Sequence, residues 1–173
     1  MSCAAMIESR FPHKKVLVIG CPGSGKSTIA RALASKTALP LYHLDMLYWN
    51  ADKTTVAKEI FHARLAEILK KDAWIIDGNY VSTMDLRLQF CDAVCFLDFP
   101  TETCLDGVRS RFGKPRADMP WIETEEDAEF MDFIKRFSTE TRPKILDLLA
   151  KYPKKAVFTF HSREELNAWV EQL

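Results

Sequence analysis

The eight residues from 20 to 27 constrain this chain more than any other stretch, because they match the pattern G-x-x-x-x-G-K-[ST]. Three of the chain's six glycines fall within this stretch, at 20, 23 and 25. Glycine admits backbone angles that other residues resist, so such a loop can turn its N–H groups toward phosphate oxygens at the start of a helix. An apolar, β-branched run precedes the loop at 16–19, and helical spacing follows at 27–36. The sequence therefore predicts a strand, a phosphate-binding loop and a helix.

The chemistry of the loop assigns a role to several of its residues. We expect Lys26 to place its charge on the β- and γ-phosphates of ATP, Ser27 to bind Mg²⁺, and Thr28 to lie beside the α-phosphate. Cys21 is either a small residue that fits the loop or a thiol whose pKa is lowered by inward-facing amides, and we favour the first interpretation. The residues expected to bind the phosphates are Gly20, Cys21, Pro22, Gly23, Ser24, Gly25, Lys26, Ser27 and Thr28.

Apolar runs alternate with helical patterns along the rest of the chain. Further strands are predicted at 41–44, 73–76, 93–99 and 155–160, and helices at 55–71 and 163–172. This alternation is typical of an α/β P-loop NTPase fold, with a five-stranded, mostly parallel sheet flanked by helices. A chain of 173 residues suits a single domain. Ligands of such sheets bind beyond the carboxyl ends of the strands, where four of the predicted strands lead into Gly20, Asp45, Asp77 and Asp98.

Composition excludes several other classes of protein. The chain has 24 Lys and Arg against 24 Asp and Glu, so its net charge of zero argues against nucleic acid as a partner. Its five cysteines form no C-x-x-C pair, which is unlike a disulfide scaffold or a zinc site. Neither a signal peptide nor an apolar run of about 18 residues is evident, so we expect a cytoplasmic protein without a membrane partner. We expect a monomer or a weak dimer.

Several separate motifs together resemble one known family. The chain lacks the N-K-x-D element with which switch GTPases read their base, and it is small for a motor ATPase. The motifs lie at 20–28, 74–80, 82–87, 96–100 and 142–146, and together they resemble the adenylate-kinase-like proteins labelled "DNA topology modulation protein". This resemblance implies the fold of nucleoside monophosphate kinases, with a short lid at about 112–122, and the use of ATP and Mg²⁺.

The resemblance also implies an acceptor site. Asp77 matches an aspartate that holds Mg²⁺ through water, and Gly78 matches a glycine that lets the acceptor approach the backbone. The sequence then departs from adenylate kinases. Asn79 and Tyr80 follow Gly78 here, whereas adenylate kinases continue with Phe-Pro-Arg. Asp45 either orients an acceptor hydroxyl, as a general base does, or is a carboxylate of a strand-end turn. The residues expected to bind the acceptor are Asp45, Asp77, Gly78, Asn79, Tyr80, Arg87 and Arg142.

A basic stretch resembles the start of a kinase lid. Arg111 matches an arginine that contacts the donor phosphates, Arg109 is placed to stack on adenine, and Arg116 to close over the γ-phosphate; a solvated basic face is the alternative. By the same resemblance, Ser162 and Arg163 lie where such kinases hold adenine. The acidic stretch from Glu123 is expected to be a solvated helix face. The residues expected to be catalytic are Lys26, Asp45, Arg111 and Arg116.

These features favour an ATP-dependent phosphotransferase that acts on a nucleotide, a nucleoside or another small hydroxyl-bearing metabolite. Two alternatives stay open: a nucleotide-regulated protein that influences DNA topology, and a slow ATPase whose acceptor is water. The four tryptophans are expected mainly in the core, although Tyr48 and Trp49 follow Asp45 closely enough to line an acceptor pocket.

Overall fold

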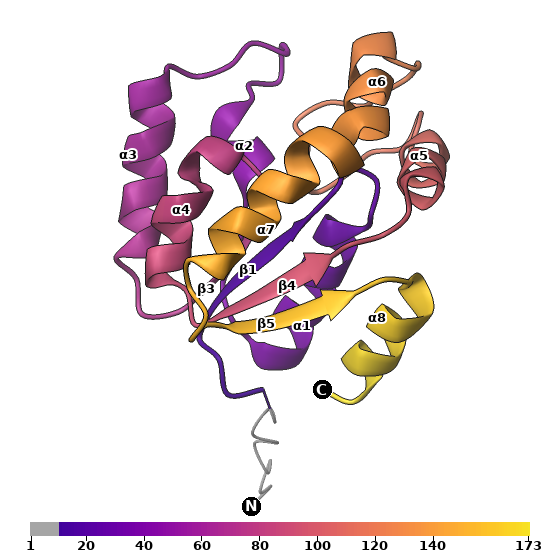
Figure 1. Ribbon diagram of the computed structural model, residues 1–173. Coiled ribbons are helices and arrows are strands. Elements are labelled where there is room, and N and C mark those ends of the chain that lie inside the picture. Colours follow the sequence, from indigo (N-terminus) through magenta and orange to yellow (C-terminus); the bar gives the residue numbers. More distant parts are fainter. Residues whose placement is uncertain (1–10) are drawn as a thin grey trace, which may run out of the picture.

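A single parallel sheet organises the chain. The computed structural model describes residues 11–173. Cys3 lies outside this range, and so does most of the N-terminal stretch in which no signal peptide was evident. The strands are β1 (Lys15–Gly20), β2 (Leu41–His43), β3 (Trp74–Asp77), β4 (Ala93–Leu97) and β5 (Ala156–Phe160). Their order is β2-β3-β1-β4-β5, and every pairing is parallel, which confirms the predicted fold class (Figure 1).

Helices cover both faces of this sheet. In Figure 1, α4 and α7 lie in front of the strands and α1 lies behind them. No helix within residues 11–173 is long and apolar enough to cross a membrane. The helical elements are α1 (Lys26–Thr37), α2 (Leu44–Tyr48), α3 (Lys58–Leu69), α4 (Val81–Phe90), α5 (Thr101–Ser110), α6 (Ala128–Arg136), the π-helical turn η1 (Phe137–Thr141), α7 (Arg142–Ala150) and α8 (Arg163–Glu171).

The central strand explains why the core forms where it does. Residues 16–19 of β1 are completely buried, as a continuous apolar strand must be when helices cover both of its faces. Leu33 of α1 packs into the same core, and Leu88 of α4 does so too. In the strand register, Val18 and His43 both lie beside Asp77. The carboxyl ends of the strands therefore bring the phosphate-binding loop, His43 and Asp77 to one edge of the sheet.

Several predicted boundaries differ from those observed. The strand predicted at 93–99 ends at Leu97. The apolar run at 41–44 ends as a strand at His43, because Leu44 already begins α2. Asp45 consequently lies in the first turn of a helix and not at the end of a strand. The helix predicted at 55–71 begins only at Lys58, since the backbone around Thr55 forms an isolated antiparallel bridge with Trp49.

An irregular segment, residues 111–127, connects α5 to α6. It includes the stretch 112–122, where the sequence suggested a lid. The N–H of Gly113 donates a hydrogen bond of 2.6 Å to the carbonyl of Glu123, so the segment folds back on itself as a closed loop. α6 begins at Ala128, and the helix expected from Glu123 onward is therefore wrong for residues 123–127. We call residues 111–127 the crossing segment.

Candidate functional site

The loop between β1 and α1 has the backbone shape of an anion cradle. Gly23 and Gly25 have φ angles of 83° and 97°, in the left-handed region that favours glycine. A Cβ atom on Gly23 would lie 2.0 Å from the carbonyl oxygen of Cys104. The Nζ of Lys26 lies over the loop, where it donates to the carbonyl of Cys21 at 3.3 Å. This geometry presents the N-terminus of α1 and a lysine charge to the same space.

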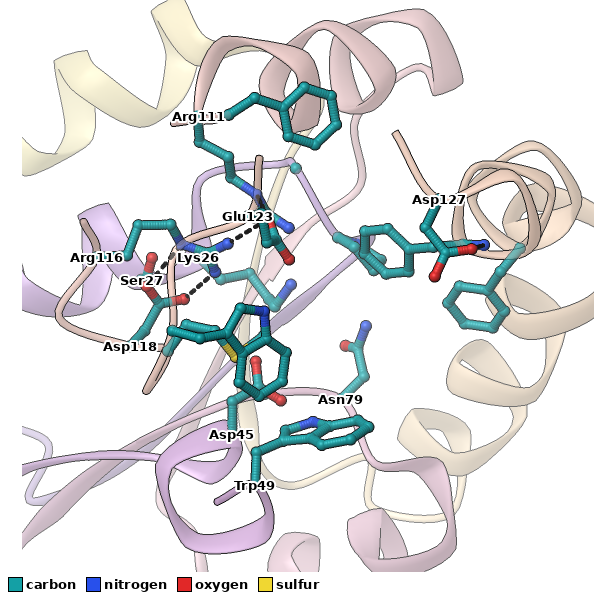
Figure 2. A pocket seen from close by; sticks show the side chains of 18 of the residues that line it. Lys26, Ser27, Asp45, Trp49, Asn79, Arg111, Arg116, Asp118, Glu123 and Asp127 are labelled. Atoms are coloured by element: carbon teal, nitrogen blue, oxygen red, sulfur yellow. Dashed lines mark hydrogen bonds and ion pairs between the residues drawn. The ribbon is translucent and has the colours of Figure 1, made fainter. Parts of the chain in front are cut away.

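That space is a cavity of about 680 Å³ above the carboxyl edge of the sheet (Figure 2). It combines the phosphate-binding loop with most of the residues predicted to bind an acceptor. The predicted site residues that line it are Pro22, Gly23, Gly25, Lys26, Ser27, Asp45, Asp77, Gly78, Asn79, Tyr80, Arg111 and Arg116. Donor and acceptor groups predicted from distant parts of the sequence thus face one volume.

Asp45 enters this cavity from the first turn of α2. Its Oδ1 accepts a hydrogen bond of 2.5 Å from the hydroxyl of Tyr80. Burial raises the pKa of Asp45 above the usual range, although this hydrogen bond and the charge of Lys26 act in the opposite direction. Burial and the neighbouring Asp45 carboxylate raise the pKa of Tyr80, so the phenol stays protonated. A carboxylate with a raised pKa inside a cavity can accept a proton from a bound hydroxyl.

One carboxylate oxygen of Asp77 contacts a neighbouring side chain, and the other has no hydrogen-bond partner among residues 11–173. Its Oδ2 lies 2.7 Å from Nδ1 of His43, the residue beside it in the sheet register. Its Oδ1 is buried and has no hydrogen-bond partner within residues 11–173. Ser27 lines the same cavity. A hydroxyl and a buried carboxylate oxygen suit Mg²⁺, which needs few protein ligands because it retains several waters. The residues present therefore fit this ion.

Asn79 connects the end of β1 to the loop that follows β3 through two side-chain hydrogen bonds. Its side-chain oxygen accepts from the N–H of Gly20 at 3.0 Å, and its side-chain nitrogen donates to the carbonyl of Gly20 at 2.5 Å. The end of β1 is thereby attached to the loop that follows β3. Asn79 lines the cavity, but both ends of its amide are engaged by Gly20.

Arg87 lies away from the cavity, although the sequence suggested an acceptor-binding role. It belongs to α4, and its side chain is completely buried. The guanidinium donates to the carbonyl of Gly78 at 3.0 Å, to that of Tyr80 at 3.3 Å, and also to that of Asn79. Arg87 therefore holds the shape of the loop at 78–80 and does not present its charge to a ligand. This placement corrects the expected role.

Arg142 is also directed elsewhere. It forms a two-point ion pair with Asp98, with both nitrogen–oxygen distances at 2.8 Å. The pair links the start of α7 to the residue after β4, and Arg142 does not line the cavity. The hydrogen bond and the negative charge of Asp98 raise the pKa of Arg142. Its predicted contact with the acceptor has no support in this arrangement, because its guanidinium is already engaged.

Two arginines of the crossing segment, Arg111 and Arg116, line the cavity and form ion pairs there. Arg116 contacts Asp118 at 2.6 Å and 3.0 Å, and it contacts Glu123 at 3.0 Å (Figure 2). Arg111 Nε lies 3.3 Å from Glu123, close enough for an ion pair but without hydrogen-bond geometry. Burial alone would raise the pKa of Asp118, but the hydrogen bonds and charge of Arg116 lower it. These carboxylates therefore balance the charge of both arginines.

The three residues expected near adenine lie outside this cavity, and they do not share one site. Arg163 donates to the carbonyls of Gly23 and Ser24 at 3.3 Å and 3.4 Å, and with Thr28 it lines a separate cavity of about 170 Å³. Ser162 caps α8 by accepting from the N–H of Glu165 at 3.2 Å. Arg109 is exposed and lies 3.4 Å from Glu126, outside both cavities. Arg163 alone of the three therefore adjoins the phosphate-binding loop.

Cys21 packs as a buried thiol. The hydrogen bond with Cys104 and burial both raise the pKa of Cys21. Both effects act against a lowered pKa of this thiol, and its role stays a prediction.

Sequence reasoning did not identify several residues that line the cavity. Trp121, expected in the core, faces it together with Trp49, and their ring centroids are 5.2 Å apart in an edge-to-face arrangement. Asp118 and Glu123 line it as well. The crossing segment carries these three side chains, and it has no periodic pattern from which their direction could be read.

Comparisons with known proteins support the fold. No protein-family model matches the chain, and no curated protein sequence matches it. Shikimate kinase from Acinetobacter baumannii, solved in complex with shikimate, superimposes with a TM-score of 0.58 at 15% identity, over 91% of each chain. Shikimate kinase from Bacteroides thetaiotaomicron gives a TM-score of 0.56 at 18% identity, over 92% of this chain and 95% of the other.

A gluconokinase from Sinorhizobium meliloti 1021 also matches, with a TM-score of 0.56 at 14% identity, over 92% of this chain and 88% of the other. At these identities the likeness concerns the fold alone, a parallel α/β fold that this chain shares with the two shikimate kinases and the gluconokinase. It gives no support to the narrower resemblance to proteins labelled as modulators of DNA topology.

Proposed function

We propose that this protein is an ATP- and Mg²⁺-dependent phosphotransferase that acts on a small hydroxyl-bearing metabolite. The observation that carries the proposal is that the loop at 20–27 with Lys26 and the half-buried side chain of Asp45 face one cavity of about 680 Å³. The solved structures of similar fold are described as shikimate kinases and a gluconokinase, whose names denote phosphorylation of small hydroxyl compounds.

The cavity supports a direct transfer between two bound molecules. The amides of the loop and Lys26 would hold the donor phosphates, and Asp45 would accept the proton of the acceptor hydroxyl. Arg111 and Arg116 would leave their carboxylates to neutralise charge on the transferred group. Ser27 and the free oxygen of Asp77 would hold Mg²⁺ and its waters, and the ion would neutralise charge on the donor phosphates.

A screen of phosphoryl acceptors tests the proposal. The protein is incubated with Mg²⁺, ATP and a panel of nucleosides, nucleotides, sugars, polyols and amino alcohols, and ADP release is measured against a reaction without acceptor. We expect at least one compound to increase ADP release and to yield a phosphorylated product by mass spectrometry. Hydrolysis of ATP with no acceptor-dependent increase would instead favour the slow ATPase, and the proposal would be abandoned.

A further inference from the structure

We propose that the acceptor for this cavity is an organic cation: a hydroxyl compound with a protonated nitrogen, held between tryptophan rings and carboxylates. This inference rests on the proposed function, because it names the class of acceptor for the same cavity. It is carried by three observations on residues 11–173: the aromatic wall, the excess of carboxylates, and the engagement of nearby arginines by other protein groups.

The aromatic wall consists of Trp49, Tyr80 and Trp121. Trp49 follows α2 and Trp121 comes from the crossing segment, and their centroids lie 5.2 Å apart. All three side chains line the cavity, and both tryptophans are half-buried. Asp45, whose carboxylate is proposed to receive the hydroxyl proton, lies next to Trp49 in Figure 2. Tryptophan faces attract cations, most strongly where water is partly excluded.

Carboxylates outnumber basic groups around the cavity. Among the described residues that line it, seven are acidic and four are basic. Lys53 and three of the acidic residues, Glu125, Glu126 and Asp127, are exposed to solvent, where their charges are screened. Four acidic and three basic residues remain. Lys26 lies over the phosphate-binding loop, where the donor would engage it. The other two basic residues are the arginines of the crossing segment, which are already held in ion pairs.

Phosphoryl transfer would increase this excess of negative charge at the acceptor. If Arg111 and Arg116 turn to the donor phosphates, Asp118 and Glu123 lose their counter-ions. Asp118 is buried, so an unpaired charge there is costly. A cationic acceptor supplies the missing positive charge, whereas a carboxylate or phosphate on the acceptor would be repelled.

An acidic acceptor would need a free guanidinium, and the structure directs the available ones elsewhere. Arg87 is buried against three backbone carbonyls, and Arg142 is paired with Asp98. Arg87 was one of the residues expected to bind the acceptor. Because it is buried, Arg87 does not present its positive charge to an anionic acceptor in this cavity.

Three probes of similar shape and different charge test the inference. L-phenylalaninol, 3-phenyl-1-propanol and 3-phenyllactate each carry a phenyl ring and a hydroxyl, and are cationic, neutral and anionic at pH 7. Calorimetric titrations into the protein, with Mg²⁺ and a non-hydrolysable ATP analogue, should show phenylalaninol binding at least about tenfold more tightly than phenyllactate, with phenylpropanol between them. Binding of phenyllactate as tight as that of phenylalaninol, or no binding of phenylalaninol at millimolar concentration, would overturn the inference.

Matched variants locate the preference in the cavity. Asp118→Asn keeps the shape of the side chain and removes its charge, so the preference for phenylalaninol over phenyllactate should fall several-fold. Glu129→Gln removes the same charge from an exposed position of α6 outside the cavity, and the preference should not change. An unchanged preference in Asp118→Asn would contradict the proposed role of this carboxylate.

A second variant covers the case in which Asp118→Asn does not fold. Trp121→Leu removes a ring from the aromatic wall, and it should weaken phenylalaninol binding by several-fold more than phenylpropanol binding. Equal weakening of both would contradict cation recognition by the ring. A titration with the ATP analogue alone separates the two proposals: absence of binding refutes the proposed function, whereas analogue binding with a preference for the anionic probe refutes only this inference.

Discussion

The hydroxyl of Tyr80 donates a hydrogen bond of 2.5 Å to the carboxylate of Asp45, across 35 residues of sequence. Tyr80 precedes α4 and has a φ angle of 35°, so its backbone adopts a left-handed conformation that non-glycine residues rarely use. Arg87 stabilises this conformation by donating to the carbonyl of Tyr80. A buried arginine thus positions the phenol, and the phenol influences the protonation of the carboxylate proposed to receive the acceptor proton.

Tyr80→Phe should shift the pH dependence of phosphoryl transfer. The hydrogen bond from Tyr80 lowers the pKa of Asp45, so its loss raises a pKa that burial has already raised. The deprotonated carboxylate is the proton acceptor, and the acidic limb of the kcat/KM profile should therefore move to higher pH, by up to about one unit. Tyr152→Phe is the control, because it removes a tyrosine–aspartate hydrogen bond at Asp85, away from the cavity. If the acidic limb does not move, Asp45 is not the group that accepts the proton.

Asp45→Asn should abolish acceptor phosphorylation and preserve donor binding. The amide cannot accept the proton of the hydroxyl, so we expect kcat to fall by about 100-fold or more. The affinity for a non-hydrolysable ATP analogue should change little, because the phosphate-binding loop is untouched. Asp106→Asn, on an exposed part of α5, is the control for loss of one charge. A variant with nearly normal kcat would remove Asp45 from the proposed chemistry.

Lys26→Met should remove turnover of the nucleotide. The ammonium lies over the phosphate-binding loop, and its loss should reduce kcat by about 100-fold to 1000-fold. Lys36→Met, exposed in the last turn of the same helix, should leave turnover unchanged. ADP release reports both variants. Equal rates in the two would contradict the role of Lys26 in holding the donor phosphates.

Gly23→Ala and Gly113→Ala separate crowding from backbone strain. Both glycines have a left-handed φ, at 83° and 73°, but a Cβ would meet the carbonyl oxygen of Cys104 at position 23 and no atom within 4 Å at position 113. Gly113→Ala should cost only about 1–2 kcal/mol of unfolding free energy. Gly23→Ala should also displace the loop and eliminate binding of the ATP analogue in a calorimetric titration. Normal analogue binding by Gly23→Ala would show that the cradle tolerates a side chain.

Arg87→Met should destabilise the fold. Its loss leaves the carbonyls of residues 78–80 without their donor, at a cost of about 2–4 kcal/mol. Arg31→Met, at an exposed position of α1, should change the unfolding free energy by less than about 0.5 kcal/mol. Urea unfolding measures both. If the two variants are equally stable, the guanidinium contributes little to holding the loop.

Local patterns accounted for the sheet and for the donor side of the site. The glycines of the loop at 20–25 and the apolar run at 16–19 act through the backbone of adjacent residues, so their consequences can be read from a short stretch. The rule that ligands bind at the carboxyl ends of parallel strands then indicated that Asp77 would lie near Lys26. The start of α3 was less predictable, because a bridge between Trp49 and Thr55 replaces the first three residues of the expected helix.

The sequence by itself determined the parallel α/β fold, the phosphate-binding loop and the edge of the sheet where a ligand would bind. Tertiary structure decided which charges reach that ligand. Four arginines have different partners: Arg87 binds carbonyls, Arg142 binds Asp98 across 44 residues, and Arg111 and Arg116 face carboxylates in the cavity. Backbone conformation depends on neighbouring residues, whereas the partner of a long charged side chain depends on the path of the whole chain.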